Sequence, residues 1–118
     1  MRAGEIHLVD FGAQDRADER DHVQRGIRPG LVIHAARYRA PGLAIMVPLS
    51  SRIRGLPHRV LVHARHDDFR TGLQQDSEAI TEQVHTVPET RVIHRIGQVP
   101  DGVLSQVLIA VHRFIAAP

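Results

Sequence analysis

The segment GIRPGLVIHA, residues 26–35, is central to how this chain folds. It joins an apolar, β-branched run, LVIHA, to the rigid dipeptide Arg28-Pro29 at its start. A second run of the same kind, GLAIMVPLSS, follows at residues 42–51. Short apolar runs that begin at glycine or proline-glycine are typical of buried strands. The two runs therefore predict two strands, the first extending toward Tyr38, with Arg28 just before it and Ser50 just after the second.

Further short strands are predicted on either side of this pair. Residues 5–11, EIHLVDF, alternate so that Ile6 and Leu8 share one face and His7 and Val9 the other. HRVLVHA at 58–64 predicts another strand, SEAITEQVHTV at 77–87 one bent strand or two, and PETRVIHRIGQV at 88–99 a proline turn and an extended piece. The polar, mixed-charge stretch between the first two strands predicts a long surface loop.

The period of the apolar residues changes near the C-terminus. One stripe recurs at three- and four-residue steps: Val103, Leu104, Val107, Leu108, Val111, Phe114 and Ile115. That spacing predicts an amphipathic helix of about 15 residues, with Asp101 as its cap and Phe114 in the core. Many short strands and one such helix favour a small, strongly curved antiparallel sheet or barrel that the helix closes.

Composition limits the class of protein. At 118 residues the chain is expected to form one domain, residues 1–118. No apolar run approaches the roughly 20 residues of a membrane span, and the N-terminus does not look like a signal peptide, so a soluble cytoplasmic protein is expected. There is no cysteine, and all 15 basic residues are arginine at a net charge of +2. Arginine suits phosphate groups, but charge alone does not establish nucleic-acid binding.

Generic catalytic and metal-binding motifs are missing from the sequence. The best metal-like pattern is HARHDD, but His63 and His66 would point to opposite faces of a strand, so no metal and no cofactor is expected. No glycine elbow surrounds a serine and no glycine-rich phosphate loop occurs. What remains is Arg28, restrained by its proline, with Ser50, Ser51 and a later EQVH. Such an arginine either stabilises charge on a phosphorus centre or pairs with a carboxylate at the strand entrance.

The order of several short motifs resembles the MazF/PemK/Kid family of bacterial toxins. GEIHLVDFG is similar to the family's opening strand, GIRPGLVI to its G-x-R-P-x-L-V signature, and VPLSS to its V-P-[LI]-T-S segment. LPHRV, GLQQDSEAITEQVHTV and RVIHRIGQV follow in the family's order. The resemblance implies a mainly β fold with a C-terminal helix, an SH3-like barrel of the CcdB/MazF type, in a homodimer.

The same resemblance implies a metal-independent endoribonuclease of a type II toxin–antitoxin system, which cleaves single-stranded RNA and so inhibits translation and growth. Arg28 falls on the family's catalytic arginine and Ser50 on its catalytic threonine. The 2′-hydroxyl of the RNA would attack the phosphate, which DNA could not do. The implied RNA-binding residues are Pro29, Ser51, Arg52, Leu56, Pro57, Glu82, Gln83, His85 and Arg25.

The sequence also departs from the family's pattern. His7, Val23 and His85 replace residues typical of the family, and the loop from Ala13 to Gly26 has lost most of the family's glycines. The arginines of this loop either follow the RNA phosphates or pair with its own carboxylates. We expect the recognised RNA sequence to differ from that of familiar members.

Two alternatives stay open from the sequence. CcdB-like toxins share the fold but poison DNA gyrase, and they do not need Arg28 and Ser50. A non-catalytic member would only bind RNA or a partner protein. The implied partner is an antitoxin whose disordered segment covers the groove.

Overall fold

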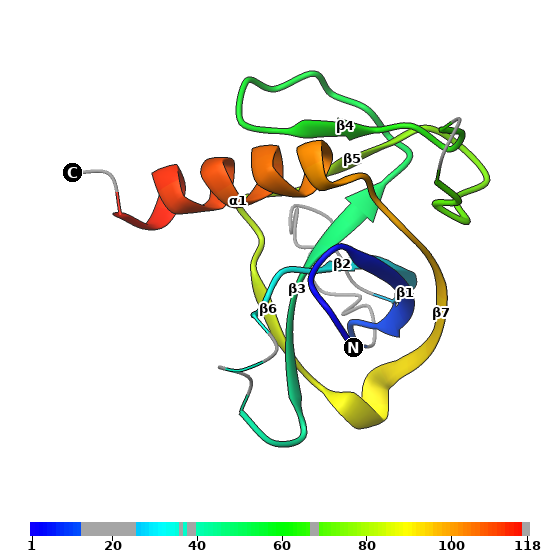
Figure 1. The fold of residues 1–118 in the computed structure, drawn as a ribbon, viewed down its shortest axis with the longest axis vertical. Coiled ribbons are helices and arrows are strands. Elements are labelled where there is room, and N and C mark those ends of the chain that lie inside the picture. The colour runs from blue at the N-terminus through cyan, green and yellow to red at the C-terminus, as the bar shows by residue number, and fades with distance from the viewer. Residues whose placement is uncertain (13–25, 36, 38–39, 67–68, 117–118) are drawn as a thin grey trace, which may run out of the picture.

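The computed structural model describes residues 1–12, 26–35, 37, 40–66 and 69–116 of the chain. In this part, seven strands and one long helix are present (Figure 1). Their bounds are β1 Glu5–Asp10, β2 Ile27–Val32, β3 Leu43–Ser50, β4 Val60–Val62, β5 Ser77–Ala79, β6 His85–Pro88, β7 Val92–Gln98 and α1 Asp101–Ala116, with a 3₁₀ turn, η2 Glu89–Arg91, before β7. No helix in the described part is long and apolar enough to cross a lipid bilayer.

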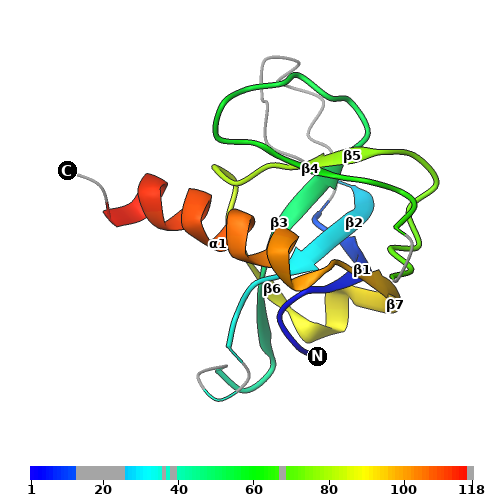
Figure 2. The same ribbon diagram turned by 45° about the horizontal axis from the view of Figure 1, so that its top comes forward.

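The strands form an antiparallel sheet in the order β4-β5-β3-β2-β1-β7, and β6 pairs with β3 beside β5. The sheet curves strongly around its centre, as Figures 1 and 2 show. The prediction of a mainly β fold with a C-terminal helix is therefore confirmed. Residues 77–87 form two separate strands, which was one of the two predicted alternatives.

Apolar runs occur in β2 and β3 because both faces of these strands are buried. Leu31 and Val47 belong to one apolar cluster, whereas their neighbours Val32 and Met46 belong to a second cluster on the opposite side. Side chains alternate between the faces of a strand, so two buried faces require a continuous apolar run. The helix α1 covers the first cluster with Val107 and Val111 and lies beside β4.

Two details of the helix differ from the prediction. Asp101 is the first helical residue, and the carbonyl of Pro100 accepts the first bonds, from the N–H groups of Val103 and Leu104. Phe114 is not in the core: half of its surface is exposed. It lies past the point where the sheet can cover the helix, so its ring packs on the edge of His58 instead.

The ends of the strands were also predicted imprecisely. Arg28 lies inside β2, not before it, because β2 begins at Ile27 and pairs with β1 from there. Ser50 is the last residue of β3. The first apolar run ends as a strand at Val32, where the imidazole of His34 accepts the N–H of Ile45 in place of a backbone carbonyl.

His63 and His66 do not lie on one continuous strand. A bend at Ala64, after β4, lies between them and brings the centroids of their rings to 5.8 Å, whereas on an unbroken strand the two side chains would point to opposite faces. His63 also contacts the carboxylate of Asp76. Across the described residues, no three histidine, aspartate or glutamate side chains come together as ligands for a metal ion.

Candidate functional site: a groove between diverging strands

A groove of about 430 Å³ opens where β2 begins and β3 ends. The first residues of β2 form one wall, and the segment that leads into β5 forms another. Its lining comprises Leu8, Ile27, Arg28, Pro29, Leu49, Ser51, Gly72, Leu73, Gln74, Gln75, Ser77 and Ile96. Three residues predicted from the sequence, Arg28, Pro29 and Ser51, therefore lie at one groove.

The groove opens where the pairing between β2 and β3 ends. β2 and β3 pair from Val32 and Met46 to Gly30 and Pro48, and the ladder stops there. Beyond it, Leu49 and Ser50 pair with β5 on the other edge of β3. Arg28 and Ser50 are each two residues beyond the end of the ladder, so they lie at the same level of the sheet where the two strands part.

Arg28 and Ser50 differ in exposure. The side chain of Arg28 is exposed and lines the groove. Ser50 is only 8% exposed, and its Oγ accepts a hydrogen bond of 3.1 Å from the N–H of Arg52. The neighbours of Ser50 on both sides, Leu49 and Ser51, line the groove. The position thus combines a permanent cation with an oriented hydroxyl, and both groups suit a phosphodiester.

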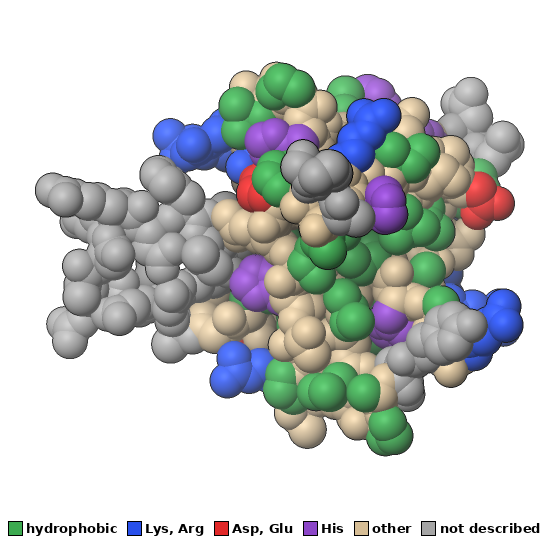
Figure 3. All heavy atoms as spheres, turned by 90° about the vertical axis from the view of Figure 1, so that its left-hand side faces the viewer, with side chains coloured by type: hydrophobic (Ala, Val, Ile, Leu, Met, Phe, Trp, Pro, Cys, Tyr) green, Lys and Arg blue, Asp and Glu red, His purple; other side chains and the backbone are tan. Residues whose placement is uncertain are grey.

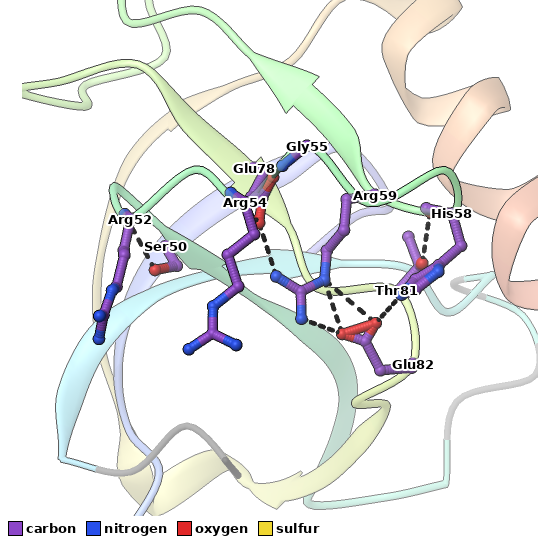
Figure 4. A network of polar contacts seen from close by, with 9 residues as sticks. All are labelled: Ser50, Arg52, Arg54, Gly55, His58, Arg59, Glu78, Thr81 and Glu82. Carbon is purple, nitrogen blue, oxygen red and sulfur yellow. Dashed lines mark hydrogen bonds and ion pairs between the residues drawn. The ribbon is translucent and has the colours of Figure 1, made fainter.

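A network of charged side chains lies behind the loop that follows Ser50 (Figure 4). The guanidinium of Arg59 donates to Glu78 Oε1 at 2.6 Å and to Glu82 Oε1 at 2.7 Å. His58 Nε2 contacts the other oxygen of Glu82. Thr81 Oγ1 donates to the carbonyl of His58 at 2.7 Å. The network ties the segment before β4 to β5 and to the turn after it.

The charges of this network stabilise one another. Burial alone would raise the pKa of Glu78, but hydrogen bonds from the Arg54 N–H, the Arg59 guanidinium and the Gly55 N–H hold that pKa below its ordinary value. Burial likewise opposes ionisation of Glu82, yet Arg59 and His58 lower its pKa. Both carboxylates are therefore ionised at neutral pH, and Arg59 is their shared counter-ion.

The remaining predicted residues lie at several places. Glu82 is bound in the charged network, and the N–H of Gln83 donates to the carbonyl of Ile80 in the turn after β5. Leu56 is exposed in the loop after β3. Pro57 lines a second hollow of about 650 Å³ beside α1. The residue Arg25, like the loop arginines around it, falls outside the described part of the chain.

His85 and His7 have less solvent contact than their types suggest. His85, on β6, packs its ring 5.0 Å from that of Phe11. Burial lowers the pKa of His85. His7 is buried on β1, where its Nε2 hydrogen-bonds the carboxylate of Glu5 at 3.0 Å.

Sequence reasoning missed several residues of this region. Gln74, Gln75 and Ser77 line the groove, and they were not among the predicted site residues. Glu78 was also missed, although it is a charged residue within a short, otherwise uncharged strand. That placement is a usable signal, because a buried carboxylate needs a specific partner.

The fold and groove thus define a small, mainly β protein with an arginine at a site suited to an anionic substrate. The chain belongs to the family of PemK-like, MazF-like toxins of type II toxin–antitoxin systems, whose model matches residues 2–115. This match confirms the family resemblance seen in the sequence and does not favour the CcdB-like alternative.

Individual relatives agree with this assignment. The chain is 31% identical over 113 residues to the endoribonuclease MazF9 of Mycobacterium tuberculosis, a match that covers 90% of this chain and 88% of the relative. The fold resembles that of MazF from Deinococcus radiodurans, with a TM-score of 0.77 at 23% identity over 98% of this chain and 96% of that one. It also resembles a mycobacterial endoribonuclease solved in complex with its cognate antitoxin, with a TM-score of 0.72 at 18% identity, covering 100% of this chain and 97% of the other.

Proposed function

We propose that this toxin is a metal-independent endoribonuclease that cleaves single-stranded RNA at short sequence motifs, with Arg28 and Ser50 as its catalytic residues. The observation that supports the proposal is that Arg28 and Ser50 each stand two residues beyond the end of the β2–β3 ladder, where Arg28 and the two neighbours of Ser50 line one groove. Membership of the family and the relative named as an endoribonuclease support it. We propose further that residues 1–118 act as one toxin domain.

The proposed reaction is an internal displacement at phosphorus. The 2′-oxygen of the RNA loses its proton and bonds to the phosphorus while the bond to the 5′-oxygen breaks. The leaving 5′-oxygen takes up a proton, so the products are a 2′,3′-cyclic phosphate and a 5′-hydroxyl end. Arg28 would neutralise charge developing on the phosphate oxygens, and Ser50 would hydrogen-bond the same group.

The other residues are proposed to hold the RNA around this position. Pro29 and Ser51 line the groove itself, and Arg52 is exposed in the following loop. Leu56, Pro57, Glu82, Gln83, His85 and Arg25 stay predicted RNA contacts. Glu82 would have to share with the RNA a carboxylate that already pairs with Arg59.

Two protein partners are proposed. A second copy of the chain would form a homodimer, which is supported by hydrophobic side chains exposed on the face that Figure 3 shows. An antitoxin is the second partner, which is supported by the neighbour solved in complex with its cognate antitoxin. The family resemblance implies that a segment of the antitoxin with acidic and apolar residues would cover the groove. RNA cleavage and antitoxin control would both take place in the cytoplasm.

The test is cleavage of a long, unstructured RNA by the purified toxin in excess EDTA. We expect discrete fragments with 5′-hydroxyl ends, whose sequencing also identifies the cleavage motif. Arg28→Ala is expected to lower the rate by roughly 10²–10³-fold, as loss of one preorganised charge-stabilising group does. Ser50→Ala should lower it less, because a hydroxyl contributes a single neutral hydrogen bond.

Arg95→Ala is the matched control. Arg95 is an exposed arginine of β7 that does not line the groove, and it contacts Glu5 and Gln98 instead. Its removal takes away the same charge and should leave the rate unchanged. RNA that stays intact with the wild type, or cleavage by Arg28→Ala at the wild-type rate, would contradict the proposal.

A further inference from the structure

Glu78 is a buried carboxylate for which the proposed chemistry has no use. It is the central residue of β5 and only 2% exposed. In the ladder it stands directly opposite Ser50 on one side and Leu61 on the other. A buried ionised carboxylate is costly unless hydrogen bonds and a counter-ion compensate it, so its partners indicate its role.

Those partners belong to the loop that follows Ser50. Glu78 Oε1 accepts the N–H of Arg54 at 3.1 Å, and Oε2 accepts the N–H of Gly55 at 3.3 Å. Oε1 also accepts from Arg59 Nη1 at 2.6 Å. One side chain therefore holds both the middle and the end of the loop from residue 51 to residue 59.

His58 and Arg59 at the end of the loop are also held by Glu82 and Thr81, but residues 51–57 have little besides Glu78 to hold them in place. All residues from 51 to 57 are exposed, so packing contributes little to its conformation. At Gly55 the backbone turns with φ at +68°, in the left-handed region that favours glycine. Glu78 binds the chain at this turn. The other end of the loop is joined to the site directly, since the Arg52 N–H donates to Ser50 Oγ.

We infer that Glu78 is a positioning residue, which orders the loop 51–59 and thereby holds Ser50 and the guanidinium groups of Arg52 and Arg54 in place for an RNA backbone. In Figure 4 the side chains of Arg52 and Arg54 extend from the same side of the loop. Arginines on an ordered loop bind phosphates with a smaller loss of entropy than arginines on a mobile loop. The inference rests on the proposed ribonuclease function, but the order of the loop can be tested without it.

The first test uses the wild-type protein and hydrogen exchange followed by NMR. The amides of Arg54 and Gly55 donate to Glu78, so we expect them to exchange at least about tenfold more slowly than in an unstructured peptide, despite their exposed residues. Exchange of both amides at the unstructured rate would overturn the inference.

The second test uses Glu78→Gln and Glu78→Asp. The glutamine side chain of the first variant cannot accept all three bonds, whereas the aspartate of the second keeps the charge beside Arg59 but is one methylene shorter. Trypsin cuts after Arg52 and Arg54 in a mobile loop. Circular dichroism first shows whether each variant is folded. In each folded variant we expect cleavage at these two sites, identified by fragment mass, to be at least about tenfold faster than in the wild type. A tenfold increase corresponds to the loss of one charged hydrogen bond.

Asp76→Asn is the matched control. Asp76 is also a carboxylate that accepts a backbone N–H, from Ala64 at 2.8 Å, and it lies two residues from Glu78. It does not touch the loop 51–59. Its variant should show trypsin cleavage after Arg52 and Arg54 at the wild-type rate. Equal cleavage rates in wild type and both Glu78 variants would overturn the inference.

The third test separates positioning from stability. The measurement is made at a temperature where each protein is fully folded. The Glu78 variants should have a kcat about tenfold lower, because Ser50 is displaced. They should also have a higher KM for RNA, because Arg52 and Arg54 are no longer held in place. A variant that is only less stable would keep both constants. Unchanged constants in folded variants would overturn the inference. If the wild type cleaves no RNA, the proposed function fails, while exchange and trypsin cleavage still decide whether Glu78 orders the loop.

Discussion

His85 shows how one partly buried side chain can couple stability to pH. Its ring packs against Phe11, its Nε2 is buried, and burial lowers its pKa below the ordinary value of 6.5. The unfolded chain therefore takes up a proton on this residue at a higher pH than the folded protein does. As the pH falls below 6.5, the free energy of unfolding should decrease until the folded-state pKa has been passed.

We expect His85→Phe to remove this part of the pH dependence, since phenylalanine packs on Phe11 and does not titrate. The measurement is the free energy of unfolding in urea at several pH values between 8 and 5. As the pH falls through 6.5, the free energy of unfolding of the wild type should decrease relative to that of the variant. A constant difference over this range would show that the burial of His85 has no effect on its titration.

At the scale of elements, the segment that leads to β5 is packed directly on the backbone of β7. A Cβ atom added at Gly97 would lie 2.2 Å from the carbonyl oxygen of Arg70, and one added at Gly72 would lie 2.1 Å from that of Ile96. The N–H of Gln98 donates to the same Arg70 carbonyl at 2.9 Å. This close approach sets one wall of the groove, because Gly72 and Ile96 both line it.

Gly97→Ala is therefore expected to be strongly destabilising, by about 3 kcal/mol, because the two backbones must move apart. The midpoint of thermal unfolding measures the effect. Gly102→Ala is the matched control: Gly102 lies in the first turn of α1, and an added Cβ would meet nothing within 4 Å. That variant should be neutral or stabilised by up to about 1 kcal/mol. Similar midpoints for the two variants would contradict the packing described for β7.

At the scale of the whole molecule, the apolar side chains that the sheet and helix leave uncovered suggest self-association. Phe114 and Ile115 near the end of α1 and Ile109 on the same helix are each at least half exposed. Phe114 and Ile115 are adjacent at the exposed end of the helix, and an exposed apolar patch is typical of an interface with another protein. In the proposed homodimer a second copy would cover them.

Light scattering on the protein as it elutes from a size-exclusion column should therefore give the mass of two chains. Phe114→Asp places a charge within the proposed interface and should reduce the mass to that of one chain, because an unpaired carboxylate is costly to bury. Asp101→Asn removes a charge at the opposite end of α1 from Phe114 and Ile115, and should leave the dimer intact. A wild-type mass of one chain at micromolar concentration would contradict the homodimer.

The sequence by itself determined the class of fold, the helix and the family. Continuous apolar runs in β2 and β3 and the change of period near residue 101 are local patterns, and each reports which faces of an element are buried. The motifs around Arg28, Ser50 and Glu82 were also visible in the sequence. Each motif consists of residues that are adjacent in the chain, so it can be compared with the family's pattern without knowledge of the fold. The sequence also placed Arg28 and Ser50 within a few residues of the ends of their strands.

Only the tertiary structure decided which of these residues share a site. The pairing of β2 with β3 places Arg28 and Ser50 the same distance beyond the end of their ladder, and the pairing of β3 with β5 places Glu78 opposite Ser50. No two of these three residues are close in sequence. Phe114 fitted the apolar stripe but lies where the sheet no longer covers the helix. The physical reason is that periodicity describes one element at a time, whereas pairing, coverage and counter-ions depend on how distant elements pack.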